Sequence, residues 1–414
     1  MQPSRFVHRR LDCGIEFAAA PIPGRKIVAL ELRVLGGMVT EPADELGVAF
    51  LTEQTLSKGT ARRTGPELSD AFDALGALHG SWVSRESIGF RGTCLPEHLD
   101  AMLDLHAELI RTPTFPDDSC RVAVELATQE LTLLEDDPGE LSRKLLMPHA
   151  YGPILGRHAY GDRATLARLS RPQIANYWRA NFHPARMQVV LGGAVDPARA
   201  ADRLEKLFGD MSPRGSEYVT PAVAFSAGAW HYHKELEQQH VGICWPGVPV
   251  RSDAHPVERV MLAILGEGMS SRLFTEVREK QGLVYWVGAW HEHPRAAGMI
   301  HLGASSTPAR CAQTCRTLLR EVERLAEDIT PDELERAKTL LTARSQTHGD
   351  LTRARTSELS ADLFFHGCPM PIEEKNAAIN RVTIDDIRAY LAAHPRDRRC
   401  VVTLGPAEPA PEAS

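Results

Sequence analysis

The residues with the clearest potential for chemistry lie in the stretch GVAFLTEQTLSKGT, residues 47–60. Its apolar residues recur at helical spacing, so positions 50 and 54 share one face of a helix, with Glu53 beside them. Two histidines there would both reach one zinc ion, and Glu53 could take a proton from the metal-bound water. Phe50 and Gln54 occupy these positions instead. Because phenylalanine has no donor atom and an amide is a poor substitute for imidazole, the stretch is either a disabled metal site or an ordinary core helix.

Arg278 and Tyr285, in the run REKQGLVY, are a second pair with chemical potential. Arginine supplies a permanent positive charge and tyrosine a hydroxyl donor, and both groups suit the stabilisation of an oxyanion. The alternative is that Arg278 is a solvated helix residue and Tyr285 a half-buried aromatic residue of a strand.

Other clusters carry weaker signals. Two pairs of histidines alternate on predicted strands, so each pair points to one face and could bind a metal ion. The pairs are His231 with His233, and His291 with His293. We identify no third ligand for either pair, and among 17 histidines chance pairs are expected. Cys311 and Cys315 are one helical turn apart, which we interpret as apolar packing.

Composition excludes several classes of protein. A chain of 414 residues is too long for one compact core and suits two domains of roughly 200 residues. The content of 43% hydrophobic and 24% charged residues is ordinary for a globular protein. The net charge of -7 argues against nucleic-acid binding, which needs a basic surface. No apolar run approaches the roughly 20 residues of a membrane span, so we expect no membrane association.

The first residues, MQPSRFVHRRLDCGIEF, have no apolar run after their arginines, so we expect no secretory signal. The eight cysteines are scattered without paired spacing, as is typical of reduced thiols. We therefore expect a cytoplasmic protein, although a removed export signal would change that expectation.

The order of predicted elements repeats along the chain. Residues 26–37 alternate like a strand and are followed by an apolar helix that ends at Gly59. Residues 238–268 give strand, polar loop, apolar helix and glycine in the same order. Residues 212–228 lose periodicity and gather Pro, Gly and Ser, as linkers do. These patterns predict a duplication of two α+β halves.

Two segments resemble the insulinase/pitrilysin family of zinc metallopeptidases, which includes the mitochondrial processing peptidases. GGMVTEPADELGVAFLTEQTLSKGT resembles the family's zinc-site segment, where the family has approximately GLAHFLEHMLFKGT. LGEGMSSRLFTEVREKQGLVYWV is similar to a segment of the family's C-terminal half. The resemblance extends from about residue 5 to about residue 405. The zinc-segment positions that keep the pattern are Gly47, Ala49, Glu53, Leu56, Lys58, Gly59 and Thr60.

The resemblance implies that the zinc site is degenerate. Phe50 and Gln54 occupy the positions of the two histidine ligands, and Glu130 falls where the family has its distal glutamate ligand. Only Glu130 of three ligands remains, so we expect no metal or other cofactor on this chain and interpret Glu53 as a remnant.

The substrate-edge strand also departs from the family. Gly80 and Ser81 stand where the family usually has an Asn-Ala pair, which implies that a contact near the scissile bond is lost. By contrast, an arginine and a tyrosine at the spacing of Arg278 and Tyr285 are associated in the family with holding substrate or stabilising the carbonyl oxygen.

Family members of this size commonly work as two-chain assemblies in which one chain has lost the zinc motif. The resemblance therefore implies a companion subunit that is inactive alone and pairs, as a heterodimer, with a homologous zinc-bearing subunit. Arg278 and Tyr285 would contribute to binding an extended peptide on a sheet edge and to its proteolysis. The alternatives are a stand-alone peptide-binding or scaffold protein, or a metallopeptidase with unrecognised ligands.

The fold implied is α+β, with two homologous mixed α/β roll domains that form half of a peptidase chamber. Each domain would consist of a mostly antiparallel sheet packed with helices. We expect an N-terminal domain at 1–215, a linker at 216–228, a C-terminal domain at 229–405 and a disordered tail at 406–414.

Overall fold

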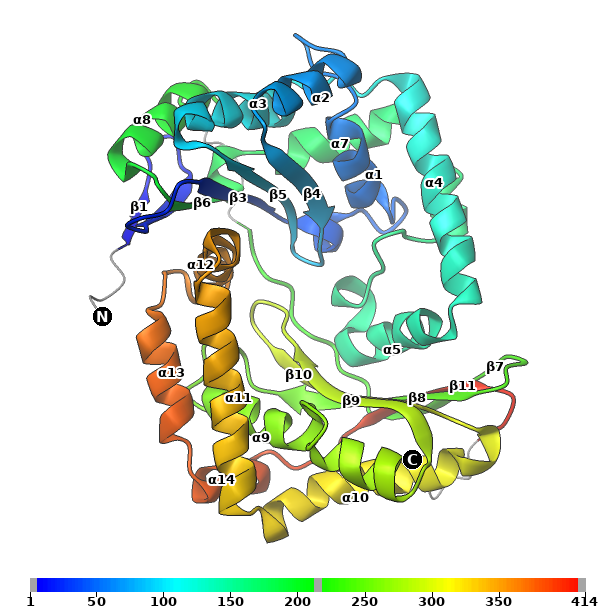
Figure 1. Ribbon diagram of the computed structural model, residues 1–414. Coiled ribbons are helices and arrows are strands. Elements are labelled where there is room, and N and C mark those ends of the chain that lie inside the picture. Colours follow the sequence, from blue (N-terminus) through cyan, green and yellow to red (C-terminus); the bar gives the residue numbers. More distant parts are fainter. Residues whose placement is uncertain (1–5, 212–217, 409–414) are drawn as a thin grey trace. The chain divides into compact units, whose positions relative to one another are not determined.

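This computed structural model describes residues 6–211 and 218–408, which divide into two compact units (Figure 1). Unit 1 comprises the described residues of 1–133, 157–221 and 347–371. Unit 2 comprises those of 134–156, 222–346 and 372–414. None of the helices in the described ranges is long and apolar enough to cross a membrane.

The sheet of unit 1 is mostly antiparallel. Its strands have the order β1-β2-β6-β3-β5-β4, and among neighbouring strands only β2 and β6 run parallel. The strands are β1 (Val7–Arg10), β2 (Glu16–Pro21), β3 (Val28–Leu35), β4 (Leu78–Val83), β5 (Ser87–Cys94) and β6 (Met187–Gly193).

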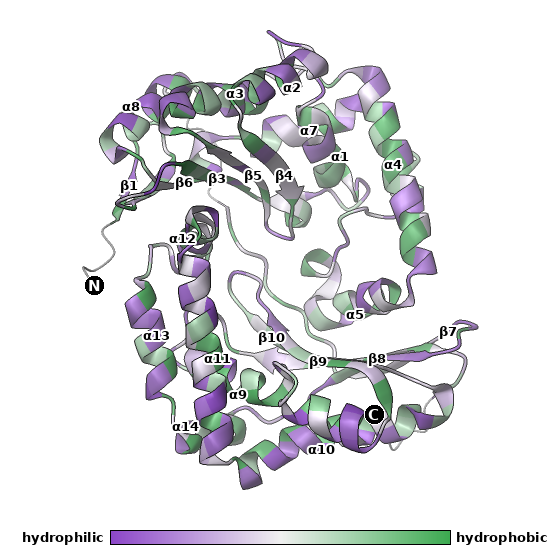
Figure 2. Cartoon of the chain, viewed as in Figure 1, coloured by the Kyte–Doolittle hydropathy of each residue, from purple (hydrophilic) through white to green (hydrophobic). Residues whose placement is uncertain are grey.

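Helices bury both faces of this sheet. In β2, Phe17 and Ala19 belong to the main core of unit 1, whereas Ala18 packs with Leu359 and Leu363 of α12. Figure 2 shows hydrophobic and hydrophilic residues on both α3 and α8, as expected for helices that cover one face of a sheet. The helices are α1 (Val48–Leu56), α2 (Gly65–Ala74), α3 (Leu99–Arg111), α4 (Asp117–Asp136), α6 (Arg163–Leu166), α7 (Arg171–Asn181), α8 (Pro197–Phe208) and α12 (Thr352–His366).

The sheet of unit 2 has the order β7-β11-β8-β10-β9, with one parallel pair, β7 and β11. The same succession occurs in unit 1 as β2-β6-β3-β5-β4, also with its parallel pair first. The strands are β7 (Gly228–His233), β8 (Gln239–Gly247), β9 (Val284–Glu292), β10 (Gly298–Ser306) and β11 (Cys400–Gly405). This shared order is what a duplication predicts.

Helix α5 packs on strands β8 and β11, whereas α9 and α10 contribute to the core that contains Val241 and Ile243. The helices of unit 2 are α5 (Pro138–Leu155), α9 (His255–Gly266), α10 (Cys311–Asp328), most of α11 (Pro331–Gly349), α13 (Ile372–Arg381) and α14 (Ile384–Ala393), with a π-helix at Phe274–Lys280.

Each unit contains a helix from the other half of the sequence. Helix α12, orange in Figure 1, packs on β2, β3 and β6 of unit 1, and α5 packs in unit 2. The compact units therefore differ from the continuous stretches 1–215 and 229–405 expected from the sequence. The physical reason is that each sheet has a second apolar face, which a helix from the other half covers.

The expected linker and tail lie partly outside the described residues. The expected linker 216–228 has no helix or strand in its described residues before β7, and its first two residues lie outside the described ranges. Residues 409–414 of the expected tail also lie outside them, as do residues 1–5 and 212–215 of the expected N-terminal domain. Residues 81–94 form parts of two strands, β4 and β5, because the chain turns at Ser84, whose N–H donates to the Ser87 carbonyl.

Candidate functional site

Helix α1 begins after a turn that Glu41 stabilises through hydrogen bonds to its side chain. Gly47 has a φ of 96°, in the left-handed region that favours glycine. The N–H groups of Gly47 and Ala49 donate to Glu41 Oε1 at 3.1 and 3.0 Å, which satisfies amides that lack a partner within the helix. Burial raises the pKa of Glu41 to about 8, although the two amides and Arg157 favour its charged form.

Phe50 and Gln54 are both engaged with neighbours. The ring of Phe50 packs edge-on against Tyr160, with ring centroids 4.9 Å apart, and is half-buried against the core of unit 1. Gln54 Nε2 donates to Glu53 Oε2 at 2.7 Å. One of the two histidine positions is therefore filled by hydrocarbon, and the other by an amide bonded to the adjacent carboxylate.

Glu53 is 5% exposed, and both of its carboxylate oxygens are hydrogen-bonded. Gln54 donates to Oε2, and the hydroxyl of Ser81 donates to Oε1. Ser81 lies in β4, the last strand of the sheet. The structure thus brings together Glu53, Gln54 and the edge-strand residue Ser81, and both carboxylate oxygens of Glu53 are taken up by these neighbours.

Glu130 lies on helix α4, which contributes Ala127 and Leu131 to the same core as Leu51 of α1. Its side chain is half-buried. Among the described residues, no group of three or more His, Cys, Asp or Glu that could hold a metal ion includes Glu53 or Glu130. A zinc ion of the family type does not fit at α1, because Phe50 offers no donor atom.

Arg278 and Tyr285 lie next to each other in unit 2. Arg278 belongs to the π-helix Phe274–Lys280, a rare element that often occurs at functional sites. Its guanidinium carbon is 4.8 Å from the ring centroid of Phe274 and 5.3 Å from that of Tyr285, in cation–π geometry. Tyr285 lies in β9, the last strand of its sheet, and is 78% exposed. The pair therefore presents a hydroxyl and a cation together.

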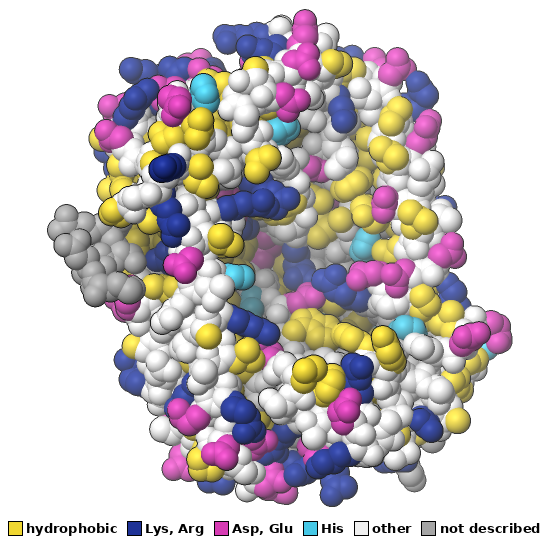
Figure 3. Space-filling model, viewed as in Figure 1, with side chains coloured by type: hydrophobic (Ala, Val, Ile, Leu, Met, Phe, Trp, Pro, Cys, Tyr) yellow, Lys and Arg dark blue, Asp and Glu magenta, His cyan; other side chains and the backbone are white. Residues whose placement is uncertain are grey.

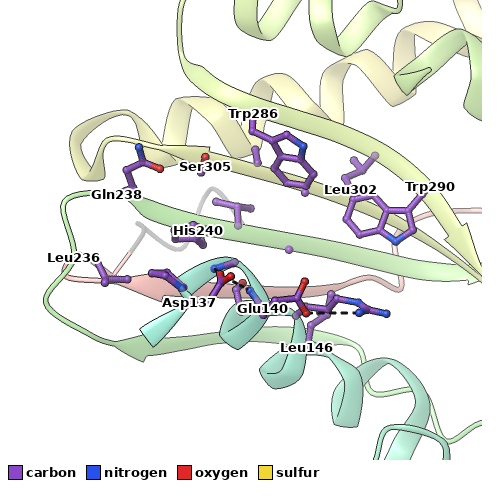
Figure 4. A pocket seen from close by; sticks show the side chains of 18 of the residues that line it. Asp137, Glu140, Leu146, Leu236, Gln238, His240, Trp286, Trp290, Leu302 and Ser305 are labelled. Atoms are coloured by element: carbon purple, nitrogen blue, oxygen red, sulfur yellow. Dashed lines mark hydrogen bonds and ion pairs between the residues drawn. The ribbon is translucent and has the colours of Figure 1, made fainter. Parts of the chain in front are cut away.

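The other face of β9 lines a cavity of about 810 Å³ between this sheet and helix α5 (Figure 4). Trp286 and Trp290 alternate with Tyr285 along the strand, and both tryptophans lie over the cavity. An ion pair between Arg143 and Glu292, 2.9 Å long, lies at one side. The cavity therefore combines aromatic walls with a few polar groups, as ligand pockets commonly do.

A cluster that the sequence did not predict lies at the other end of β9. His255, His291 and His293 have donor atoms that all lie within 4.8 Å of one another. Glu258 Oε1 is 4.0 Å from Nε2 of both His291 and His293. Burial lowers the pKa of His291 to about 2 and that of His293 to about 4, and neighbouring positive groups add to both effects. Burial raises the pKa of Glu258.

The sequence indicated His291 and His293 as a pair but no third ligand. His255 and Glu258 lie on a helix that precedes β9, and the short spacing of HPVE was the one available signal. The other histidine pair has separate partners, since His231 bonds Thr403 and the exposed His233 pairs with Glu235.

Cys311 and Cys315 are buried in the core of unit 2, in agreement with their interpretation as packing residues. On the face visible in Figure 3, acidic and basic side chains are interspersed, without a large basic patch.

Comparison with known proteins identifies two regions of similarity. Residues 17–163 match the family described as "Insulinase (Peptidase family M16)", and residues 168–341 match "Peptidase M16 inactive domain". An "Uncharacterized zinc protease" of Rickettsia felis is 24% identical over 380 residues, which cover 91% of this chain and 92% of the relative.

Solved structures share the fold. A "peptidase M16 inactive domain" from Pseudomonas fluorescens superposes with a TM-score of 0.89 at 21% identity and covers 98% of both chains. A "protease from Helicobacter pylori" also has a TM-score of 0.89, at 15% identity, with 98% of this chain and 100% of that one covered. The prediction of two mixed α/β domains, each with a sheet packed by helices, is confirmed.

Proposed function

Because this chain belongs to the insulinase family, peptidase family M16, and lacks the two histidines of its zinc motif, we propose that it is the non-catalytic companion subunit of a zinc peptidase. The partner would be a homologous chain with an intact H-x-x-E-H helix, and the catalytic zinc ion would lie on that partner. The chain would be inactive alone and would contribute Arg278 and Tyr285 to proteolysis in the heterodimer.

The observation that carries the proposal is the contrast between the two sets of family residues. At α1, both oxygens of Glu53 are bonded and Phe50 fills a ligand position, so this helix has no means to activate water. Arg278 and Tyr285 keep the groups that an oxyanion requires, and Tyr285 is largely exposed. The chain thus keeps the residues suited to binding substrate, but it lacks the zinc ligands that water activation requires.

The stacked arrangement of Arg278 suits the proposed role. Phe274 and Tyr285 hold the guanidinium by their ring faces, which restricts its motion before substrate arrives. A positioned donor stabilises developing negative charge more strongly than a mobile one, because no reorganisation is needed during the reaction.

Strand β9 supports the binding of an extended peptide. It is the last strand of its sheet, so its outer backbone groups could pair with a peptide by β-strand addition. Since β9 alternates Tyr285 on one face with Trp286 and Trp290 on the other, an apolar substrate side chain could enter the cavity of about 810 Å³ while a peptide carbonyl contacts the Arg278–Tyr285 pair.

The test is reconstitution with a zinc-bearing homologue from the same genome. The two full-length chains are co-expressed, and cleavage of quenched fluorescent peptides is measured for each chain and for the mixture. We expect activity in the mixture alone.

Arg278→Ala should lower kcat by about 10²-fold without loss of co-purification, because one oxyanion donor is removed. Tyr285→Phe tests the hydroxyl in the same way, and Lys280→Ala is the matched control, since this exposed lysine of the same π-helix pairs with Glu276, one helical turn away.

Two outcomes would overturn the proposal. Full activity of the partner without this chain would remove the need for a companion. Unchanged activity of the mixture with both Arg278→Ala and Tyr285→Phe would remove the assigned roles. If instead this chain binds peptides alone and the tryptophan cavity carries that binding, the stand-alone peptide-binding alternative is favoured.

A further inference from the structure

Four side chains with metal-binding atoms converge in unit 2. His255 is the first residue of α9, and Glu258 lies one turn further along that helix. His291 lies near the end of β9 and His293 directly follows the strand, so alternation directs both imidazoles to one face. The ring centroids of His291 and His293 are 4.3 Å apart. The ring centroid of His255 lies 5.3 Å from that of His291 and 5.1 Å from that of His293.

Glu258 is oriented into this cluster. The residue is fully buried, and its Oε2 accepts hydrogen bonds from the Val248 N–H at 2.9 Å and from the Tyr390 hydroxyl. These two bonds fix the carboxylate so that Oε1 faces the histidines, 4.0 Å from two imidazole nitrogens. Oε1 itself is buried without a hydrogen-bond partner. A buried carboxylate oxygen in that state is costly, and a bound cation would satisfy it.

We propose that His255, Glu258, His291 and His293 form a binding site for a divalent transition-metal ion of the zinc class. Imidazole and carboxylate are ligands that suit zinc, with bonds of about 2.0–2.2 Å in tetrahedral geometry. Such bonds place the ligand atoms about 3.4 Å apart. Since the imidazole donors already lie within 4.8 Å of one another, small side-chain rotations bring them to that spacing.

The charges around the cluster act in both directions. Arg259 and His301 both lower the pKa of His291. The positive charge of Arg259 also disfavours a bound cation at this place. Glu292 acts in the opposite sense on His293, and Glu267 offsets the charge of Arg259. The carboxylate of Glu258, inside the cluster, supplies the negative charge that a dication needs, and Tyr390 holds it in place.

The ligand set indicates a structural ion. Four protein ligands complete tetrahedral coordination and leave no position for substrate, in contrast to a catalytic zinc site. A bound ion would join the start of α9 to the end of β9, and through Glu258 and Tyr390 to α14. The site therefore belongs to this chain alone and does not depend on the proposed companion role. It also goes against our expectation from the sequence that the chain carries no metal.

The test uses the full chain, purified with a cleavable tag that contains no histidine. Zinc is removed with a chelator, one equivalent of Zn²⁺ is added back, and bound zinc is measured by elemental analysis after desalting. We expect about one zinc per chain, an upward shift of Tm on zinc addition, and an absorption spectrum at the zinc edge typical of nitrogen and oxygen ligands.

Variants locate the ion. His291→Ala and Glu258→Gln should each weaken zinc binding at least 10-fold and abolish the Tm shift, because each removes one ligand. His233→Ala is the matched control, since this exposed histidine of β7 lies outside the cluster. Glu53→Gln combined with Glu130→Gln should leave zinc binding unchanged.

Three results would overturn the proposal. They are the absence of bound zinc in the wild-type chain, unaltered binding in both cluster variants, and loss of binding in the Glu53/Glu130 double variant. Since His291→Asn keeps a polar side chain of similar size, it serves as the variant of choice if His291→Ala does not fold.

Discussion

Glu53 of unit 1 and Glu258 of unit 2 are both buried carboxylates on helices, but their surroundings are opposite. Glu53 lies in a stretch that closely resembles a zinc motif, and its two oxygens accept hydrogen bonds from Gln54 and Ser81. Glu258 lies in no recognisable motif, yet one of its oxygens has no hydrogen-bond partner and faces imidazole nitrogens. In this chain, the glutamate that lies in a zinc-like motif is therefore not the one with an oxygen left available for a ligand.

The difference shows what makes a buried carboxylate available. At α1 the donors are neighbours in sequence or on the adjoining edge strand, and they leave the carboxylate satisfied. At α9 the backbone of Val248 and the hydroxyl of Tyr390 hold one oxygen and orient the other. The second arrangement is preorganised for a ligand, because the surrounding protein fixes the geometry before binding.

The largest expected effect concerns a third buried carboxylate, Glu41, at the start of α1. Its Oε2 also has no hydrogen-bond partner, but Glu41 belongs to no cluster of metal donors in the described ranges. Burial raises its pKa from 4.5 to about 8, so between these values the folded protein holds a proton that the unfolded chain releases. The stability that Glu41 contributes therefore falls as pH rises from about 5 to 8, by about 4 kcal/mol in total.

The measurement is urea unfolding of the wild type and of Glu41→Gln between pH 5 and pH 9. The wild type should lose stability relative to the variant as pH rises, because the amide does not titrate. A difference between the two proteins that is constant with pH would contradict this prediction and the burial that underlies it.

The next largest effect is expected at Glu258. Replacement by alanine leaves the buried Val248 N–H and the Tyr390 hydroxyl without their acceptor, so Glu258→Ala should lower the free energy of unfolding by about 3 kcal/mol. The comparison is made with chelator present, so that metal binding does not contribute. Glu258→Gln keeps an acceptor for both donors and should lose about 1 kcal/mol. Equal losses in the two variants would show that the hydrogen bonds do not stabilise unit 2.

A smaller effect is expected for Phe50, the residue that replaces a zinc ligand. Phe50→Ala removes the packing against Tyr160 and should cost about 2 kcal/mol, less than for a fully buried ring. Phe50→Leu should cost under about 1 kcal/mol because most of the volume is kept. Thermal unfolding checks both values, and a neutral Phe50→Ala would mean that position 50 no longer serves the core.

The smallest effect is expected at Glu53 itself. Glu53→Gln keeps one acceptor oxygen and should change stability by under about 1 kcal/mol, since the bonds from Gln54 and Ser81 are largely retained or exchanged. Peptidase activity of the reconstituted heterodimer should be unchanged. If activity falls 10-fold or more, Glu53 is no remnant and the contrast with Glu258 fails.

The strong local patterns predicted many elements of the fold. The alternating run 26–37 contains β3, and the apolar helical stretch that ends at Gly59 contains α1. The repeated order of elements predicted two similar halves, and both sheets have the same strand succession. These predictions depended on periodicity and turn residues, which short stretches of sequence contain in full.

Long-range pairings were not predictable in this way. No local pattern indicates that α5 packs on β8 and β11, or that α12 covers β2 and β6 of unit 1. Both helices have buried apolar residues, such as Leu146 of α5 and Leu359 of α12, but the sheet that each one covers is set by contacts between residues far apart in the sequence.

The sequence by itself determined the family and the loss of zinc ligands at α1, because residue type alone decides whether a donor atom exists. It also placed Arg278 and Tyr285 at a spacing that the structure brings into contact. Only the tertiary structure decided that Glu53 is satisfied by Ser81, and that His255 and Glu258 meet His291 and His293. The physical reason is that donor chemistry belongs to single residues, whereas a site requires distances between elements, and packing sets those distances.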